Sequence, residues 1–242
     1  MKRNDLTIYD THAETWWAGE TRWLRVLANM VPARLRHFER ETEGWSGCSV
    51  LDLGCAGGFL AEALAHQGAT VTGIDPAAKT IDTARAHAAA EGLSIQYDVG
   101  VGEALPYPDD NFDYVVCVDV LEHVESVPKT LSEIARVLKP GGVFCFDTIN
   151  RNALARFVVI TGAEDILGLL PKGTHDPALF IKPAELEAML RETGFDPRPM
   201  RGLGPTGINR RLDFTFGITP FTGIVYIGTA LLTADSSTQA AA

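Results

Sequence analysis

Short apolar runs alternate with helical segments through most of the chain, and this alternation constrains the fold more than any other feature of the sequence. The runs lie at residues 49–53, 70–75, 94–100, 112–119 and 143–149. Strands separated by helices of about 10–20 residues form right-handed βαβ units, and such units build a parallel sheet. The pattern predicts a doubly wound α/β domain.

The length of 242 residues suits one elaborated domain rather than two. We expect an N-terminal helical cap at 1–46, with two short helices that separate near Pro32, followed by a main domain at 47–233. The small, polar residues 234–242 predict a disordered tail. Residues 152–183 are too long and too apolar for an ordinary loop, which indicates a lid or a docking insertion.

Charge and cysteine content exclude several classes of function. The net charge of −10, without a basic patch, disfavours binding to a nucleic-acid backbone. The four cysteines lack CxxC spacing, so we expect buried thiols rather than disulfides or a zinc site. The residues after Met1 do not form the apolar region of a signal peptide, which predicts a cytoplasmic location.

A glycine-rich turn, VLDLGCAGG, follows the first predicted strand at residues 50–58. In a doubly wound sheet this is the position where a ligand binds. Gly54 allows the chain to reverse sharply, and we expect Gly57 and Gly58 to let a ligand approach the backbone. The spacing lacks the second glycine of the dinucleotide-binding fingerprint, which counts against a nicotinamide dinucleotide.

Two acidic residues narrow the choice of ligand. Asp52 lies two residues before the turn, where a carboxylate would repel a diphosphate but could receive a cationic amino-acid group. Asp75 ends the second predicted strand, and a carboxylate there can accept hydrogen bonds from both hydroxyls of a ribose. A ligand with a ribose, an ammonium group and no phosphate is S-adenosylmethionine (SAM), although a Rossmann-like domain that binds another nucleotide remains an alternative.

Four motifs between about residues 48 and 146 carry a resemblance to a known family. They are VLDLGCAGG, GID, LPYPDDNFDYV and LKPGG, and in this order they resemble the motifs of class I SAM-dependent methyltransferases. The resemblance implies a Rossmann-like fold around a mostly parallel, seven-stranded sheet.

Later motifs resemble a narrower family, the O-methyltransferases of ubiquinone biosynthesis. These motifs are VLEHV, TINRN, TGAEDILGLLPKGTHD and FIKPAEL. The resemblance implies methylation of a phenolic or catechol oxygen on a polyprenylated ring. Transferred by position, it implies SAM contacts at the residues Arg34, Gly54, Asp75 and Val118. We add Cys55 and Gly57 of the turn, together with Asp52, to the expected cofactor site.

Asp119, Glu122 and His123 form a candidate catalytic trio after the fourth predicted strand. If the chain turns helical there, the spacing of i, i+3 and i+4 places all three side chains on one face. They could then hold a divalent cation such as Mg²⁺. The resembled family is thought to use this trio for a metal, with Glu in place of Asp119. Two alternatives stay open: His123 acts alone as a general base, or the residues form a structural polar cluster.

The insertion after the fifth strand has two interpretations. Its segment 153–171 is apolar but contains charges, so it is not a membrane span. It could lie in the membrane interface and give access to a lipid-soluble substrate, or it could pack on its own domain as a lid. His175 and Asp176 lie farther along the insertion, where they could reach over the active site or form a hydrogen bond that orders the lid.

The sequence therefore predicts an enzyme that moves a methyl group from SAM to a ring oxygen of a quinone precursor or a related polyphenol. A C- or N-methyltransferase of secondary metabolism is an alternative, because LPYPDD and RRLDFTFGITP look unlike the quinone enzyme. A non-catalytic module that binds SAM or another nucleotide is a further alternative, which would not need the polar trio.

Overall fold

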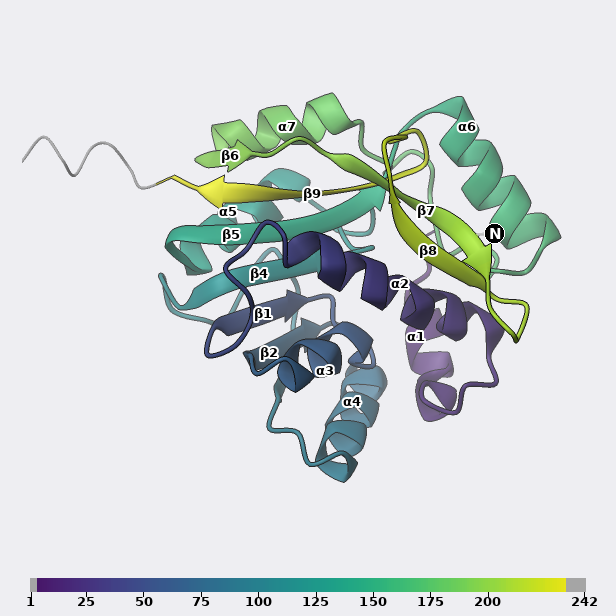
Figure 1. Cartoon of the computed structure of the whole chain (residues 1–242), viewed down its shortest axis with the longest axis horizontal. Helices are drawn as coiled ribbons and strands as arrows, with labels where there is room; N and C mark the ends of the chain where they lie inside the picture. Colours follow the sequence, from purple (N-terminus) through teal and green to yellow (C-terminus); the bar gives the residue numbers. More distant parts are fainter. Residues whose placement is uncertain (1–3, 234–242) are drawn as a thin grey trace, which may run out of the picture.

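The computed structural model of the chain describes residues 4–233 (Figure 1). The tail expected at residues 234–242 lies outside the described residues. The strands are β1 (Ser49–Leu53), β2 (Thr70–Asp75), β3 (Gln96–Val99), β4 (Phe112–Val118), β5 (Leu138–Ile149), β6 (Phe195–Pro197), β7 (Arg201–Ile208), β8 (Phe214–Thr219) and β9 (Val225–Leu232). The helices are α1 (Thr7–Thr11), η1 (Ala13–Thr15), α2 (Arg22–Phe38), α3 (Phe59–His66), α4 (Ala78–Ala90), α5 (Val127–Val137), α6 (Ala153–Arg156), η2 (Phe157–Ile166) and α7 (Pro183–Glu192).

The strands form one sheet in the order β3-β2-β1-β4-β5-β9-β7-β8, with β6 beside β9. Strands β1 to β5 pair in parallel, whereas β9 runs antiparallel to β5. The predicted doubly wound α/β fold is confirmed. The sheet has nine strands rather than seven, because short β6 and the hairpin strand β8 extend its antiparallel side.

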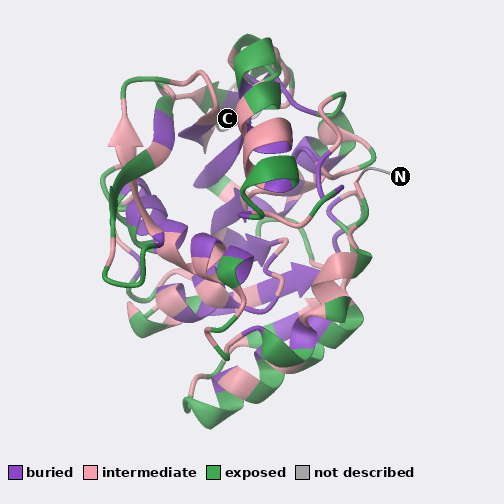
Figure 2. Ribbon diagram, turned by 90° about the vertical axis from the view of Figure 1, so that its right-hand side faces the viewer, coloured by how far each residue is buried: buried purple, intermediate pink, exposed green. Residues whose placement is uncertain are grey.

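Helices cover both faces of the sheet, and strand residues alternate between two cores. Val50 of β1 packs in the core with residues of α2, α3 and α4. Leu51, the next residue, packs in the other core with residues of α5 and α7. This alternation is the two-residue period of a strand that is buried on both sides. Figure 2 shows the central strands in the buried colour between helices with exposed outer surfaces, whereas the hairpin of β7 and β8 is largely exposed or intermediate.

Helix α2 corrects the expected break near Pro32. It runs for 17 residues with Pro32 inside it and ten of its residues buried. An interior proline costs about 3 kcal/mol because it removes a hydrogen bond and crowds the preceding turn. Burial of one whole face of α2 against the sheet outweighs that cost, which the local sequence pattern did not show.

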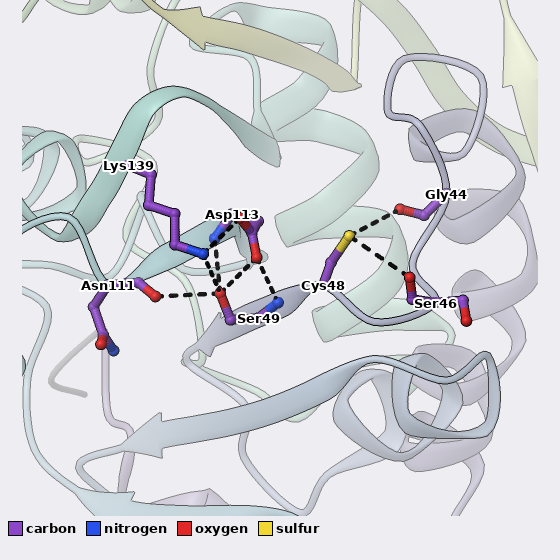
Figure 3. Close-up of polar contacts among 7 residues, drawn as sticks. All are labelled: Gly44, Ser46, Cys48, Ser49, Asn111, Asp113 and Lys139. Atoms are coloured by element: carbon purple, nitrogen blue, oxygen red, sulfur yellow. Dashed lines mark hydrogen bonds and ion pairs between the residues drawn. The ribbon is translucent and has the colours of Figure 1, made fainter.

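Polar contacts fix the amino end of β1, opposite the glycine turn (Figure 3). The Ser49 amide and hydroxyl both donate to Oδ2 of Asp113, at 2.8 and 2.7 Å, and Lys139 Nζ donates to Oδ1 at 2.7 Å. Burial would raise the pKa of Asp113, but the hydrogen bonds from Lys139 and Ser49 outweigh it and lower the pKa. These contacts join β1, β4 and β5 in register, so that β1 and β4 end side by side at the opposite edge.

The insertion after β5 contains a continuous helical stretch, α6 followed by η2. Val159 and Ile160 pack against Ile149 and Phe180 in a small core of their own. The opposite side exposes the apolar side chains of Leu154, Phe157, Ile166 and Leu167. Within residues 4–233, no helix has both the length and the apolar character needed to cross a bilayer.

Candidate active site

A cavity of about 720 Å³ lies at the carboxyl ends of β1, β2 and β4. Its floor comes from the glycine turn, the end of β2 and the chain after β4. Its roof comes from the N-terminal segment, through Asn4, Leu6, Tyr9, Asp10 and Trp16. In Figure 1, α1 lies on the side toward which the arrows of these strands point. Six of the seven predicted cofactor residues line this cavity: Arg34, Asp52, Gly54, Cys55, Asp75 and Val118.

The glycines of the turn serve the fold more than direct ligand contact. Gly54 has a φ of +77°, and a Cβ there would lie 2.1 Å from Cγ2 of Val120. At Gly57 a Cβ would meet the indole ring of Trp16 at 2.4 Å, and at Gly58 it would meet the hydroxyl of Tyr97 at 2.5 Å. The expectation that Gly57 and Gly58 make room for a ligand is therefore corrected, since they make room for aromatic side chains.

Asp52 provides an unsatisfied carboxylate in the cavity. The residue is 1% exposed, and its Oδ2 has no hydrogen-bond partner among the residues that the structure describes. Burial and the nearby Asp75 raise the pKa of Asp52 to about 7, while Arg34 opposes the shift. A buried acceptor of this kind favours a ligand that brings a positively charged donor. The ammonium group of SAM is such a donor.

Asp75 lies beside Asp52 at the end of β2. Its two oxygens accept the amides of Ala77 at 2.8 Å and Ala56 at 3.0 Å. Burial raises the pKa of Asp75 to about 6 despite these hydrogen bonds. A carboxylate offers about four acceptor sites, so two bonds leave capacity for the hydroxyls of a ribose.

Arg34 is a buried structural cation at the base of the cavity. Its Nε and Nη2 donate to the two oxygens of Asp147 at 2.6 and 3.1 Å, and Nη2 also donates to Asp119 at 2.5 Å. Asp147 is fully buried and lies outside the motifs considered in the sequence. Because its guanidinium binds these two carboxylates, Arg34 stabilises the wall of the cavity.

The trio expected at Asp119, Glu122 and His123 does not form as predicted. The chain after β4 makes an irregular turn rather than a helix, and Asp119 adopts a φ of +53°. The Asp119 carboxylate pairs with Arg34. The expected helical spacing is corrected, because the chain makes a turn here, and Asp119 is not among the donor atoms that gather near His123.

Glu122 and His123 instead lie near His175 of the insertion. One donor atom from each of the three residues lies within 4.8 Å of the others. Glu122 is 1% exposed and accepts a hydrogen bond from the Thr148 hydroxyl at 2.7 Å. Oε1 of Glu122 and Nε2 of His123 have no hydrogen-bond partner within the described part of the chain. The sequence left open whether His175 reaches over the site or orders the insertion, and it did not assign His175 to this cluster.

Burial and neighbouring charges set the protonation of the cluster. Burial and Asp119 raise the pKa of Glu122. Burial and the nearby His175 lower the pKa of His123 to about 3, so this imidazole is neutral. Glu164, which is 4% exposed, holds His175 through Nδ1 at 2.9 Å and through its amide at 3.0 Å. The cluster can offer neutral imidazole nitrogen and carboxylate oxygen to a ligand.

Comparisons with known proteins give the family of the chain. Residues 51–146 match the family model described as a methyltransferase domain. The ubiquinone biosynthesis O-methyltransferase of Thiobacillus denitrificans is 43% identical over 82% of this chain and 85% of its own length. The protein of the same name from Proteus mirabilis is 37% identical over 84% of this chain and 83% of its own.

Solved structures resemble the fold at lower identity. A SAM-dependent methyltransferase from Thermotoga maritima has a TM-score of 0.66 and 18% identity, covering 95% of this chain and all of that one. A SAM-dependent methyltransferase from Aquifex aeolicus has a TM-score of 0.60 and 16% identity, covering 83% and 92% of the two chains. At this identity they support the fold alone. On the sequence matches, the chain belongs to the ubiquinone biosynthesis O-methyltransferases, a family of SAM-dependent enzymes.

Proposed function

We propose that the protein transfers a methyl group from SAM to a phenolic or catechol oxygen of a quinone precursor. One observation carries the proposal: a single cavity has the unsatisfied carboxylate of Asp52 at one part of its wall and His123 at another. The first suits the cofactor's ammonium group, and the second suits a phenolic acceptor. The names of the relatives support ring-oxygen methylation in ubiquinone biosynthesis.

The reaction is an in-line displacement. The acceptor oxygen forms a bond to the methyl carbon while the bond from that carbon to sulfur breaks, which leaves S-adenosylhomocysteine. A phenol has a pKa of about 10, so its proton must leave for the oxygen to attack well at neutral pH. His123 is neutral and has a lone pair for that proton. Burial lowers its pKa to about 3 and so weakens it as a base, an effect that the nearby Asp119 opposes. The cavity holds the reactants close together.

A divalent cation fits the Glu122–His123–His175 cluster, because two of its buried donor atoms have no partner within residues 4–233. Two imidazoles and one carboxylate favour Zn²⁺, Mn²⁺ or Fe²⁺ over the Mg²⁺ expected for a trio of two carboxylates and one imidazole. A bound cation would lower the pKa of a phenol and orient its oxygen. Asp119 is not part of this donor set.

The test is product formation from SAM with a panel of catechols, demethylated quinols and amines. We expect turnover of catechols and quinols. Turnover of amines alone would indicate the alternative N-methyltransferase, and SAM binding without any product would indicate the binding module. The panel is repeated after chelation and after addition of Mg²⁺, Mn²⁺ or Zn²⁺. Full activity in chelator would favour His123 as a base without a metal.

We also propose that the α6–η2 stretch contacts a membrane surface. Leu154, Phe157 and Ile166 expose apolar side chains on it, and Phe157 and Ile166 are 61% and 71% exposed. Liposome flotation should recover the wild type and not the variant Phe157→Ser/Ile166→Ser. The variant Leu212→Ser removes a 77% exposed leucine from another surface and serves as the control. Equal flotation of all three proteins would argue for a lid that packs only on its own domain.

A further inference from the structure

Asn4 contacts His123 through both ends of its amide, although 119 residues separate them. Its Nδ2 donates to the backbone oxygen of His123 at 3.3 Å, and its Oδ1 lies 2.6 Å from Nδ1 of the same ring. Asn4 also lines the cavity. Its φ of +61° is left-handed, a conformation that asparagine tolerates better than most residues with a side chain.

The two contacts determine where the ring proton lies. A backbone carbonyl can only accept, so the amide group facing it must be the NH₂ of Asn4. The amide oxygen then faces Nδ1 and can only accept as well, so Nδ1 must carry a proton. A neutral imidazole has one N–H, and therefore Nε2 holds a lone pair.

The lone pair of Nε2 is the atom that the chemistry needs. Nε2 is buried and has no hydrogen-bond partner among residues 4–233. In the other tautomer this nitrogen would carry a proton and could neither accept one from a phenol nor bind a cation. The side chain of Asn4 therefore selects the useful form of His123 under either interpretation of the cluster.

We propose that Asn4 is a positioning residue that holds His123 in its Nδ1–H tautomer and so leaves Nε2 as the reactive nitrogen. The effect on turnover rests on the proposed methyl transfer, whereas the tautomer is a property of the protein alone. Other contacts hold the same segment in place, since Asp10 accepts two amides of α4 and the Asp5 amide donates to the Gly173 oxygen at 3.4 Å. His123 is thus prepared when the roof covers the cavity.

The test measures the tautomer by ¹⁵N NMR of histidine-labelled protein, with His123→Gln used to assign the signals. In the wild type we expect a protonated Nδ1 and an unprotonated Nε2 at His123. Asn4→Gly removes both contacts while it keeps the left-handed backbone, so the Nε2–H form should become populated. Its kcat should fall about 10-fold or more, as for other residues that orient a reactive imidazole, with the Kd for SAM within about twofold of wild type.

The matched control is Asn29→Ala, which removes an amide contact to a backbone oxygen, that of Phe214 at 3.1 Å, outside the cavity. It should leave both the tautomer and kcat unchanged. The inference is overturned if wild-type His123 carries its proton on Nε2, or if Asn4→Gly leaves the tautomer unchanged. Absence of wild-type turnover on catechols and quinols would refute the proposed function separately, because the NMR measurement needs no substrate.

Discussion

Gly54 shows how one residue controls the cofactor cavity. Its φ is positive, and a Cβ added there would lie 2.1 Å from Cγ2 of Val120, so the position has no room for a side chain. Gly54→Val should therefore displace the turn or the chain after β4, both of which line the cavity, and abolish SAM binding. Isothermal titration calorimetry with SAM measures this directly.

Gly92→Val is the control for Gly54→Val, because it separates backbone strain from lost space. Gly92 has a similar φ of +71°, but a Cβ there meets nothing within 4 Å. This variant should lose some stability and keep its affinity for SAM. If both variants bound SAM like the wild type, the cavity would not be the cofactor site.

Individual residues were predictable where a motif fixes the backbone around them. Asp52, Asp75 and Val118 lie at strand ends, and the strand pattern alone places such ends at one edge of the sheet. The helical spacing expected at Asp119 was wrong, because the chain there makes a turn with positive φ and the carboxylate pairs with the distant Arg34. Asn4 gave no signal in the sequence, since its contact with His123 exists only after the N-terminal segment folds over the sheet.

At the scale of the elements, a side chain of α1 caps the N-terminus of α4. The cap residue of α4, Ala77, has no side chain that can accept the first amides. Oδ1 of Asp10 accepts them instead, from Lys79 at 3.0 Å and Thr80 at 3.2 Å. Asp10 thus replaces a local cap residue, and the same contacts connect the roof of the cavity to α4.

We expect Asp10→Ala to lower the free energy of unfolding by about 1 kcal/mol, the usual effect of a lost N-cap. Because Asp10 also lines the cavity, the affinity for SAM should fall in the same variant. Urea unfolding and calorimetry measure the two effects. Asp82→Ala, on the exposed side of α4 with a side chain 74% exposed, should change neither. A stability loss at Asp10 without a loss of affinity would show that the roof does not depend on this contact.

The parallel half of the sheet was predictable from the sequence, and the parts around it were less so. Each of the first five strands is a short apolar run between helical segments, so local pattern and tertiary burial agree there. The continuous α2 and the added strand β8 depend on packing against each other, which no local pattern reports. For the same reason the sequence did not predict that His175 of the insertion lies close to Glu122 and His123 in the turn after β4.

At the scale of the whole molecule, part of the negative charge of the chain lies in the cavity. The chain has a net charge of −10, and Asp52, Asp75 and Asp119 all line one cavity that also contains Arg34. The carboxylates repel one another in the absence of a cationic ligand. SAM brings a sulfonium and an ammonium group, so its binding should depend on how many of these carboxylates are ionised.

This dependence gives a prediction about pH. The folded pKa of Asp52 is raised from 3.8 to about 7. In the unliganded protein this raised pKa favours the protonated form of Asp52. The part of the free energy of unfolding that comes from this shift is present at low pH and is lost as the pH rises from about 4 through about 7. SAM should reverse the preference, because its ammonium group should pair with ionised Asp52. The affinity for SAM should therefore rise about fivefold between about pH 6 and 7.5, where most of the ammonium remains charged.

The variants that test this pH dependence are Asp52→Asn and Asp113→Asn. Asp52→Asn should bind SAM more weakly and show no more than about a twofold change of affinity in this window, because Asp75, with a pKa of about 6, goes only from about half ionised to almost fully ionised. Asp113 lies at the opposite end of the sheet and has a lowered pKa, so Asp113→Asn should keep the wild-type slope. Calorimetry across the window measures all three proteins. A wild-type slope in Asp52→Asn would mean that another group receives the cofactor's ammonium.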